Sequence, residues 1–215
     1  MGIFDQKKTM ALSVEDLEDP CRFRQILKVP YDELIGFVLD YIRRRTGIML
    51  FFWSVCLACL GLALTIRINI AGYFPLKNII FHSFLGLIVF PLLIIPVHEI
   101  LHIIPFLFAG ARRIRVGIDL RQYLFYVTAH RHVVNSRQFR LVAYTPFIIV
   151  NIILLALILV LPGLWKWSLS LLLFVHSTMC AGDFALLNFF DIHKKKKVYT
   201  WDDADEKIAY FYEEI

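Results

Sequence analysis

His98, Glu99 and His102 stand close together in an apolar stretch of this sequence. Side chains four positions apart lie on the same face of an α-helix, so both imidazoles could bind one metal ion. Imidazole nitrogen is a common zinc ligand, and a glutamate beside the ion could take a proton from a zinc-bound water. The spacing therefore predicts a hydrolytic zinc site, with His98 and His102 as ligands and Glu99 as general base.

The position of Glu99 strengthens this prediction. The residue lies inside the apolar segment 79–109, which is long enough to cross a membrane. A charged carboxylate in a bilayer costs at least ~2.5 kcal/mol on insertion scales, so some interaction has to offset that cost. The alternative interpretation is a hydrogen-bonded polar cluster that holds helices together and does no chemistry.

A catalytic zinc ion usually has three protein ligands and one open position. Asp183 and Asp191 are the other carboxylates in or beside an apolar segment, and Asp191 is expected to be solvated at its end. Counted from Gly110 and Asp191, His102 and Asp183 lie at equal depth, about 12 Å at 1.5 Å per residue. We therefore expect Asp183 to be the third ligand. His176, about 10 Å deeper on the same helix, is the weaker candidate for that position.

The remaining polar residues of interest have simpler interpretations. His82 lies near the outer end of its segment and His193 in a basic tail, so neither is expected to be catalytic. His130 and His132 could share one face of a strand and bind metal, but we expect solvated side chains. Asn151 could stabilise an oxyanion or bond to a neighbouring helix, and we favour the second role.

The composition indicates a membrane protein, because 59% of the 215 residues are hydrophobic and 19% are charged. About 20 apolar residues cross roughly 30 Å of hydrocarbon. Prolines at 91, 96 and 105 predict that the second of the spans is kinked or broken. A Pro-Gly pair at 162–163 predicts a tight turn between antiparallel third and fourth spans. The four predicted spans are 47–66, 79–109, 141–161 and 164–190.

Basic residues are concentrated on one side of the predicted bundle. Twenty of the 23 Lys and Arg residues lie before residue 47, in 110–140 or after 191. The positive-inside rule therefore places both termini and the 110–140 loop in the cytoplasm. The net charge of +5 fits contact with anionic headgroups of the bilayer. Nucleic acid is excluded as a partner, because the basic blocks flank apolar segments and lack recognition motifs.

Three parts outside the spans have a predicted structure. Tyr31–Arg45 has helical spacing and ends in three arginines, which predicts an interfacial helix. Strand-forming residues at 114–118 and 123–127 predict a β-hairpin in the loop, and an extended substrate could bind along its edge. Apolar residues at helical spacing in Trp201–Ile215 predict a short cytoplasmic helix.

The predicted fold is an all-α polytopic membrane protein with four transmembrane helices, the second kinked by proline, a small cytoplasmic β-hairpin and short interfacial helices. Residues 1–46 form a cytoplasmic region, 47–190 the transmembrane metalloprotease domain with loop 110–140, and 191–215 a cytoplasmic tail. Met1–Leu12 lacks the apolar run of a signal peptide. The four cysteines show no disulfide or zinc-finger spacing.

The chain resembles the putative zincin peptidase family of small bacterial membrane proteins, which is distantly similar to the site-2 intramembrane metalloproteases. The resemblance rests on residues 98–102 in a span, the basic strand-forming loop and Ala181-Gly182-Asp183, and it covers about residues 80–215. It implies a zinc metalloprotease of the bacterial inner membrane that cleaves membrane-protein or peptide substrates. Site-2 proteases carry their third ligand in an Asn/Pro-Asp-Gly setting. The Gly-Asp-Phe sequence here leaves the third ligand and the substrate class open.

Two other kinds of protein remain possible from the sequence alone. In a four-helix haem protein, His98 or His102 would pair with His176 as axial ligands, but the residue count places His176 at a different depth. A non-catalytic membrane scaffold or transporter component would keep the polar cluster for packing. A Soret band would indicate the first, and the absence of bound metal would indicate the second.

Overall fold

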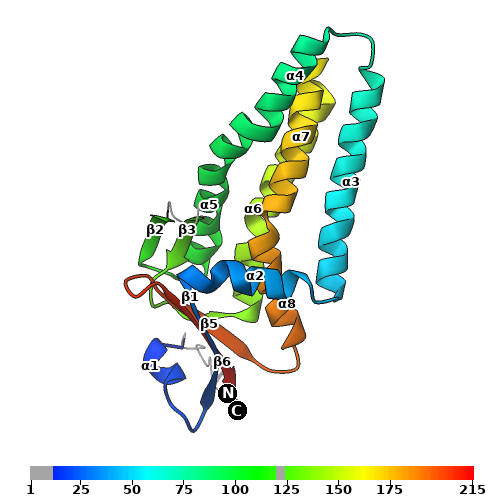
Figure 1. Ribbon diagram of the computed structural model, residues 1–215. Helices are drawn as coiled ribbons and strands as arrows, with labels where there is room; N and C mark the ends of the chain where they lie inside the picture. Colours follow the sequence, from blue (N-terminus) through cyan, green and yellow to red (C-terminus); the bar gives the residue numbers. More distant parts are fainter. Residues whose placement is uncertain (1–11, 120–123) are drawn as a thin grey trace, which may run out of the picture.

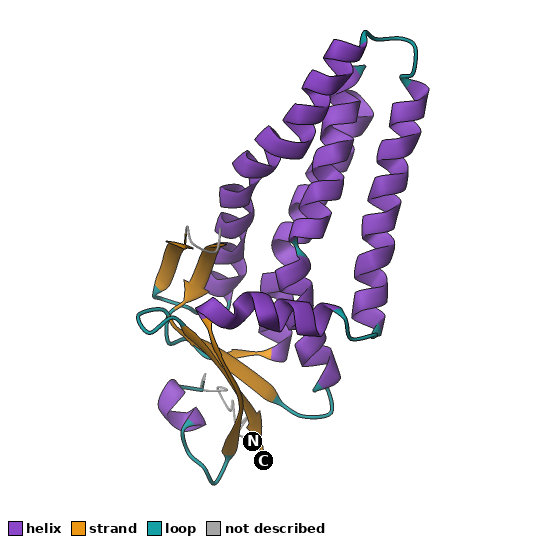
Figure 2. Cartoon of the chain, in the orientation of Figure 1, coloured by secondary structure: helices purple, strands orange, loops and turns teal. Residues whose placement is uncertain are grey.

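Long apolar helices run side by side in the computed structural model, which describes residues 12–119 and 124–215 (Figure 1). Strands are confined to one end of this bundle (Figure 2). Among the described residues, four helical stretches are long and apolar enough to cross a membrane. The chain thus has the pattern of a multi-pass membrane protein, as the sequence predicted. The stretches are Gly47–Asn69, Leu76–Phe108, Ser136–Val160 and Leu164–Ile192.

Polar caps set the beginnings of the first and third stretches. The hydroxyl of Thr46 accepts a hydrogen bond from the Met49 amide and begins α3 (Gly47–Asn69). The side chain of Asn135 accepts from two amides in the first turn of α6 (Ser136–Val160), and Gln138 bonds back to the Asn135 amide. This cap begins the helix before residue 141, the predicted start.

The second stretch is irregular, as predicted, but the irregularity lies before the prolines, and Pro96 and Pro105 stand inside an uninterrupted helix. The stretch consists of α4 (Leu76–Phe84), a π-helical turn η2 (Leu85–Val89) and α5 (Phe90–Phe108). Gly86 lies in the π-helical turn and packs against α7, where a Cβ at this position would collide with the Ser168 carbonyl oxygen. The absence of a side chain therefore allows the close approach of two helices here.

The fourth stretch is broken, which the sequence pattern did not predict. Helix α7 (Leu164–Met179) ends at Cys180, and α8 (Ala181–Ile192) begins directly after it. The break puts Asp183 in the first turn of α8, where a carboxylate interacts favourably with the helix dipole.

A short helix was predicted in Trp201–Ile215, and this prediction is wrong. Residues 198–214 form a β-hairpin of β5 (Val198–Asp203) and β6 (Ile208–Glu214). The Asp203 carboxylate accepts hydrogen bonds from two amides in the turn, and Lys207 has a φ of 57°. Aromatic residues in β6 favour a strand, and their spacing fits either structure.

This hairpin belongs to a four-stranded sheet in the order β1-β6-β5-β4. Strand β1 (Phe23–Pro30) pairs with β6, and the two-residue strand β4 (Val134–Asn135) pairs with β5. The prediction of an all-α fold with a single hairpin therefore has to be corrected. The chain is mostly helical, with two small sheets at one end of the bundle.

The other elements predicted outside the spans are present. The helix predicted in Tyr31–Arg45 corresponds to η1 (Tyr31–Glu33) and α2 (Leu34–Ile42). The hairpin of the 110–140 loop consists of β2 (Ile114–Asp119) and β3 (Leu124–Ala129). A short helix, α1 (Val14–Leu17), precedes β1. Tyr123, part of the predicted hairpin, and residues 1–11, part of the segment tested for a signal peptide, lie outside the described residues.

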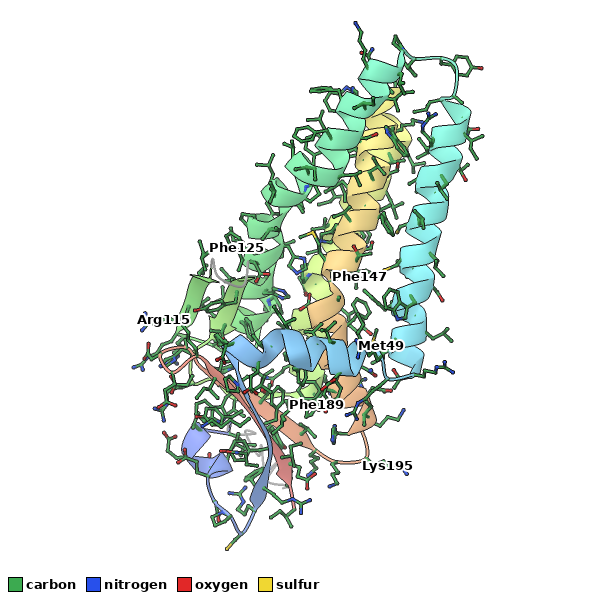
Figure 3. All side chains as sticks on the ribbon, in the orientation of Figure 1. Met49, Arg115, Phe125, Phe147, Phe189 and Lys195 are labelled. Carbon is green, nitrogen blue, oxygen red and sulfur yellow. The ribbon has the colours of Figure 1, made fainter. Side chains whose placement is uncertain are left out.

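Aromatic side chains join the sheet to the bundle. Phe37 of α2, Phe189 of α8 and Phe211 of β6 form one buried cluster. A second cluster contains Met49 of α3 and Phe147 of α6 (Figure 3). The first cluster fixes β5 and β6 against the helices that carry the candidate site.

Candidate metal centre

Helix α5 presents both motif histidines on its buried face. His98 and His102 are each 7% exposed, and their ring centroids are 5.0 Å apart. Val97, Ile100 and Ile104 on the outer surface are more than 40% exposed, as expected for side chains that face lipid. The helix thus separates a lipid-facing surface from a polar interior site.

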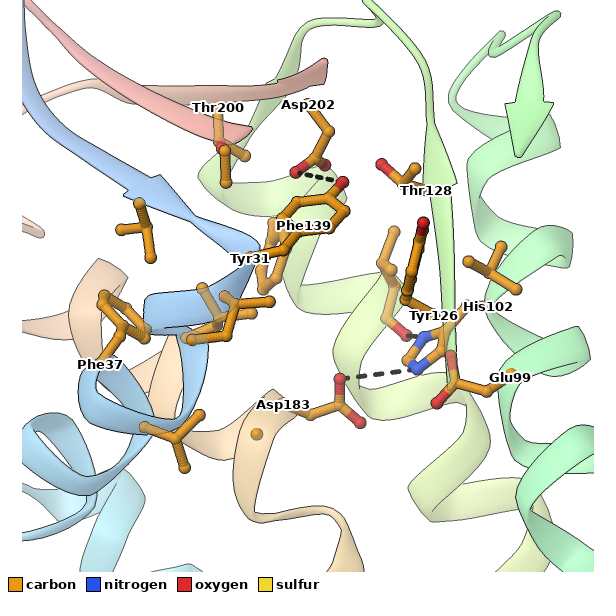
Figure 4. Close-up of a pocket in the computed structure, with 18 of the residues that line it drawn as sticks. Tyr31, Phe37, Glu99, His102, Tyr126, Thr128, Phe139, Asp183, Thr200 and Asp202 are labelled. Atoms are coloured by element: carbon orange, nitrogen blue, oxygen red, sulfur yellow. Dashed lines mark hydrogen bonds and ion pairs between the residues drawn. The ribbon is translucent and has the colours of Figure 1, made fainter. Parts of the chain in front are cut away.

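Asp183 lies beside both imidazoles. Its Oδ2 is 3.3 Å from His98 Nε2, and its Oδ1 is 3.6 Å from His102 Nε2. The second of these contacts is drawn in Figure 4. The break at Cys180 lets α8 begin at this level, so the carboxylate faces α5 from the first turn of α8.

Hydrogen bonds behind the two histidines fix which nitrogen carries the proton. His102 Nδ1 lies 3.0 Å from the Val142 carbonyl oxygen, which can only accept, so this nitrogen is the donor. His98 Nδ1 lies 3.2 Å from His176 Nε2, and His176 Nδ1 lies 2.8 Å from Asn151 Oδ1. Because Asn151 Oδ1 accepts, His176 is protonated on Nδ1, and its Nε2 accepts from His98 Nδ1. In their neutral form, both motif histidines therefore turn an unprotonated Nε2 toward Asp183.

These three side chains fit a zinc ion. Zinc bonds to nitrogen and carboxylate oxygen measure 2.0–2.2 Å, so neighbouring ligand atoms of a tetrahedral site lie about 3.3–3.5 Å apart. The Nε2 to oxygen distances of 3.3 and 3.6 Å are close to this value. Asp183 Oδ2 is buried and has no hydrogen-bond partner among the described residues, so a cation would satisfy it. Two imidazoles and a carboxylate are also a donor set of catalytic zinc sites.

His176 lies closer to the site than the residue count predicts. Its ring centroid is 5.3 Å from that of His98, so it matches the depth of His98. A count along one stretch against another assumes two uninterrupted helices, but the second stretch contains a π-helical turn and the fourth is broken at Cys180, between His176 and Asp183. The direct hydrogen bond between His98 and His176 leaves no room for an iron and a macrocycle between them, which argues against axial haem ligation by this pair.

A second group of possible metal ligands shares His98. The ligand atoms of His98, His176 and Cys180 lie within 4.8 Å of one another, as do those of His98, Glu99 and His102. The first group would have to use His98 Nδ1, which already donates to His176. The group that faces Asp183 uses the free Nε2 atoms, and it lies beside Glu99.

Glu99 lines a cavity of about 280 Å³ together with His98, His102 and Asp183. The cavity continues from the histidines to the small sheets (Figure 4). Strand β3 forms one wall with residues 126–128, and Tyr31 and Asp202 lie at the far end. The sequence patterns did not identify Tyr31, Thr128 or Asp202 as site residues, because no local motif connects them with the histidines.

Among the other polar residues singled out in the sequence, Asn151 supports this centre from behind His176, and the rest have partners elsewhere. Asn151 bonds to His176 and, through its amide nitrogen, to Ser177 of α7. His130 was expected to be solvated, but it is 8% exposed and accepts a hydrogen bond from the Ala204 amide. His82 bonds to Ser168, His193 Nδ1 lies 2.8 Å from the Phe189 carbonyl oxygen, and Asp191 lies 3.5 Å from Lys194.

A family model described as "Putative zincin peptidase" matches residues 91–198. The matched range contains the two motif histidines, Glu99 and Asp183. No curated protein and no solved structure matches the chain.

Proposed function

The chain belongs to the putative zincin peptidase family, and on this basis we propose that it is an intramembrane zinc peptidase that hydrolyses peptide bonds of membrane-associated substrates. One observation carries the proposal. The Asp183 carboxylate lies within 3.6 Å of the Nε2 atoms of both histidines in a motif that also supplies Glu99. A polar cluster that served only for packing would not need two unprotonated nitrogens directed at a carboxylate.

His98, His102 and Asp183 would hold the zinc ion. A bound zinc ion would supply a Lewis acid that polarises the scissile carbonyl and lowers the pKa of water toward about 7. The hydrogen bonds to Val142 and from His98 to His176 keep the two imidazoles in the tautomer and orientation that binding requires.

Glu99 would act as general base. Its carboxylate lines the cavity beside both histidines, where it can take a proton from the attacking water. The same carboxyl can then donate this proton to the leaving amine, which must be protonated as the C–N bond breaks.

Strand β3 is the proposed site of substrate presentation. One edge of β3 pairs with β2, and residues 126–128 line the cavity. A peptide added along β3 would be extended, so its carbonyl groups would be free of helical hydrogen bonds. Replacing residues 114–118 with a Gly-Ser stretch removes the support of β3 and should weaken cleavage without loss of zinc. Unchanged cleavage would count against this part of the proposal.

The proposed location is the cytoplasmic membrane, with both termini and the sheets in the cytoplasm. The excess of Lys and Arg in the segments on the sheet side supports this orientation. The cavity would then lie near the cytoplasmic boundary, since it extends from α5 to the sheets.

The proposal is tested by the metal content of the purified protein. Wild-type protein should contain about one zinc per chain, and His98→Ala should contain far less while it keeps its helical circular dichroism. Cleavage of a membrane-embedded test peptide in detergent should be lost with the zinc and restored on its return. A wild-type protein that binds no zinc when zinc is supplied would leave only the packing role for the polar cluster.

A further inference from the structure

The far end of the cavity contains a carboxylate that the proposed chemistry does not use. Asp202 of β5 lines the same cavity as Glu99 and His102 (Figure 4). The Tyr31 hydroxyl donates to Asp202 Oδ1 over a long 3.5 Å. Burial raises the pKa of Asp202 to about 6, so the group is mostly ionised at neutral pH.

No cation of the described chain neutralises Asp202. Within residues 12–119 and 124–215, no Lys, Arg or His nitrogen lies within 4.0 Å of its carboxylate. The backbone amide of Arg131 does bond to the Asp202 carbonyl oxygen. The guanidinium of Arg131, however, lies over the Trp201 ring and near Glu15. A buried carboxylate that has hydroxyl neighbours but no cation beside it among the described residues is costly, so a ligand that carries a cation would be favoured there.

The surroundings of Asp202 suit a long cationic side chain. Thr128 is 4% exposed, lines the cavity, and its Oγ1 has no hydrogen-bond partner among the described residues. Tyr31 and Tyr126 pack edge to face with ring centroids 5.0 Å apart, and Phe37 lies on the same cavity. Aromatic walls can cover the methylene chain of Lys or Arg, and the carboxylate and hydroxyl can accept from its charged end.

From this arrangement we propose that Asp202 binds a basic side chain of the substrate, so that the protein acts on membrane segments with Lys or Arg close to the scissile bond. The inference rests on the proposed peptidase function and adds a substrate class to it. Membrane helices carry Lys and Arg mainly at their cytoplasmic ends, where the cavity of the proposed orientation lies. Asp202 would thus bind the Lys and Arg residues whose distribution also orients membrane proteins.

The test uses the full-length protein in detergent and a lysine scan. A set of apolar test peptides carries one lysine at successive positions, and matched peptides carry norleucine, which has nearly the same shape without the charge. At the best position, wild type should prefer lysine over norleucine in kcat/KM by about 10- to 100-fold, the range of a hydrogen bond to a charged group. Asp202→Asn should lose most of this preference.

Asp203→Asn is the matched control. Asp203 neighbours Asp202, but its Oδ1 accepts hydrogen bonds from two backbone amides of the hairpin turn. An asparagine side-chain oxygen can accept the same hydrogen bonds. This variant should retain the lysine preference. Equal lysine preference in wild type and Asp202→Asn, or equal loss in both variants, would overturn the inference.

A peptide-binding measurement distinguishes failure of this inference from failure of the proposed function. Peptide affinity measured by fluorescence anisotropy in a Glu99→Gln background needs no cleavage, and the lysine peptide should bind more tightly there than the norleucine peptide. If wild type cleaves none of the peptides, the peptidase function fails and this binding measurement still tests Asp202. If peptides are cleaved but neither assay depends on Asp202, the function stands and the inference fails.

Discussion

Replacing His176 tests whether this residue positions the candidate zinc ligand His98 or would itself bind zinc. His176 is fully buried, and its Nε2 accepts a hydrogen bond from His98 Nδ1 over 3.2 Å. In His176→Leu, a side chain of similar size removes this acceptor. His98 then has no partner for Nδ1–H and can instead carry its proton on Nε2, which lies 3.3 Å from Asp183 Oδ2. A proton at Nε2 occupies the position that zinc requires.

The expected loss follows from the second of these contacts. The hydrogen bond to His176 is independent of zinc, so its loss affects the metal-free and metal-bound states alike, whereas a new hydrogen bond from Nε2 to the Asp183 carboxylate would stabilise only the metal-free state, by about 1.5–3 kcal/mol. This corresponds to roughly 10- to 100-fold weaker zinc binding, within the range known for residues that orient metal ligands. Asp183→Ala removes a ligand and should weaken binding by about tenfold more, or beyond.

Competition with a zinc-binding indicator in detergent measures both affinities, and thermal melts of the metal-free proteins show whether each variant is folded. His176→Gln restores a carbonyl acceptor and should fall between wild type and His176→Leu. Zinc loss in His176→Leu as complete as in Asp183→Ala would refute the reasoning and make His176 a ligand. No loss at all would mean that the tautomer of His98 has no effect on binding.

Three further predictions follow from other parts of the structure. Glu99→Gln should keep the fold and the zinc but lower peptide hydrolysis by about 10²–10⁴-fold or more, because an amide cannot accept the proton; full activity in the cleavage assay would exclude Glu99 as the base. Gly86→Ala should lower the free energy of unfolding by about 1–3 kcal/mol, because its Cβ would collide with the Ser168 carbonyl, and a lower melting temperature would show this. Gly61→Ala in α3, where a Cβ has open space, should be neutral or stabilising. Asp202→Asn should raise the melting temperature more at pH 8 than at pH 5. The folded-state pKa of Asp202, about 6, exceeds the ordinary value of 3.8, so the wild-type protein loses stability as the pH rises between these values. An equal gain at both pH values would contradict this burial cost.

The membrane part of the fold could be predicted because its signals are local. Length and apolar composition identify each span, and prolines mark the second as irregular. The break of the fourth stretch at Cys180 has no proline beside it, so nothing in the pattern indicated it. The break also explains why a count of residues gave a useful depth for Asp183 and a misleading one for His176.

The four-stranded sheet was missed for a different reason. Ile208, Ala209, Phe211 and Tyr212 fit helical spacing as well as a strand, and the choice depends on pairing with β1, which lies far away in the sequence. The histidines and Glu99 share one helical turn and could be identified without tertiary structure. Tyr31 and Asp202 meet at the cavity only through the order β1-β6-β5, so local patterns contain no information about them.

The pairing of β1 with β6 also sets a time order for the assembly of the cavity during synthesis. Phe23 pairs with Glu214, and all four candidate spans lie between these strands in the sequence. At about 5–20 residues per second, a ribosome makes β6 roughly 10–35 s after β1. Throughout this interval the helices can enter the membrane while β1 has no partner and β5, with Asp202, is still to come. A nascent chain would therefore insert its candidate metal ligands before the wall that is proposed to hold the substrate exists.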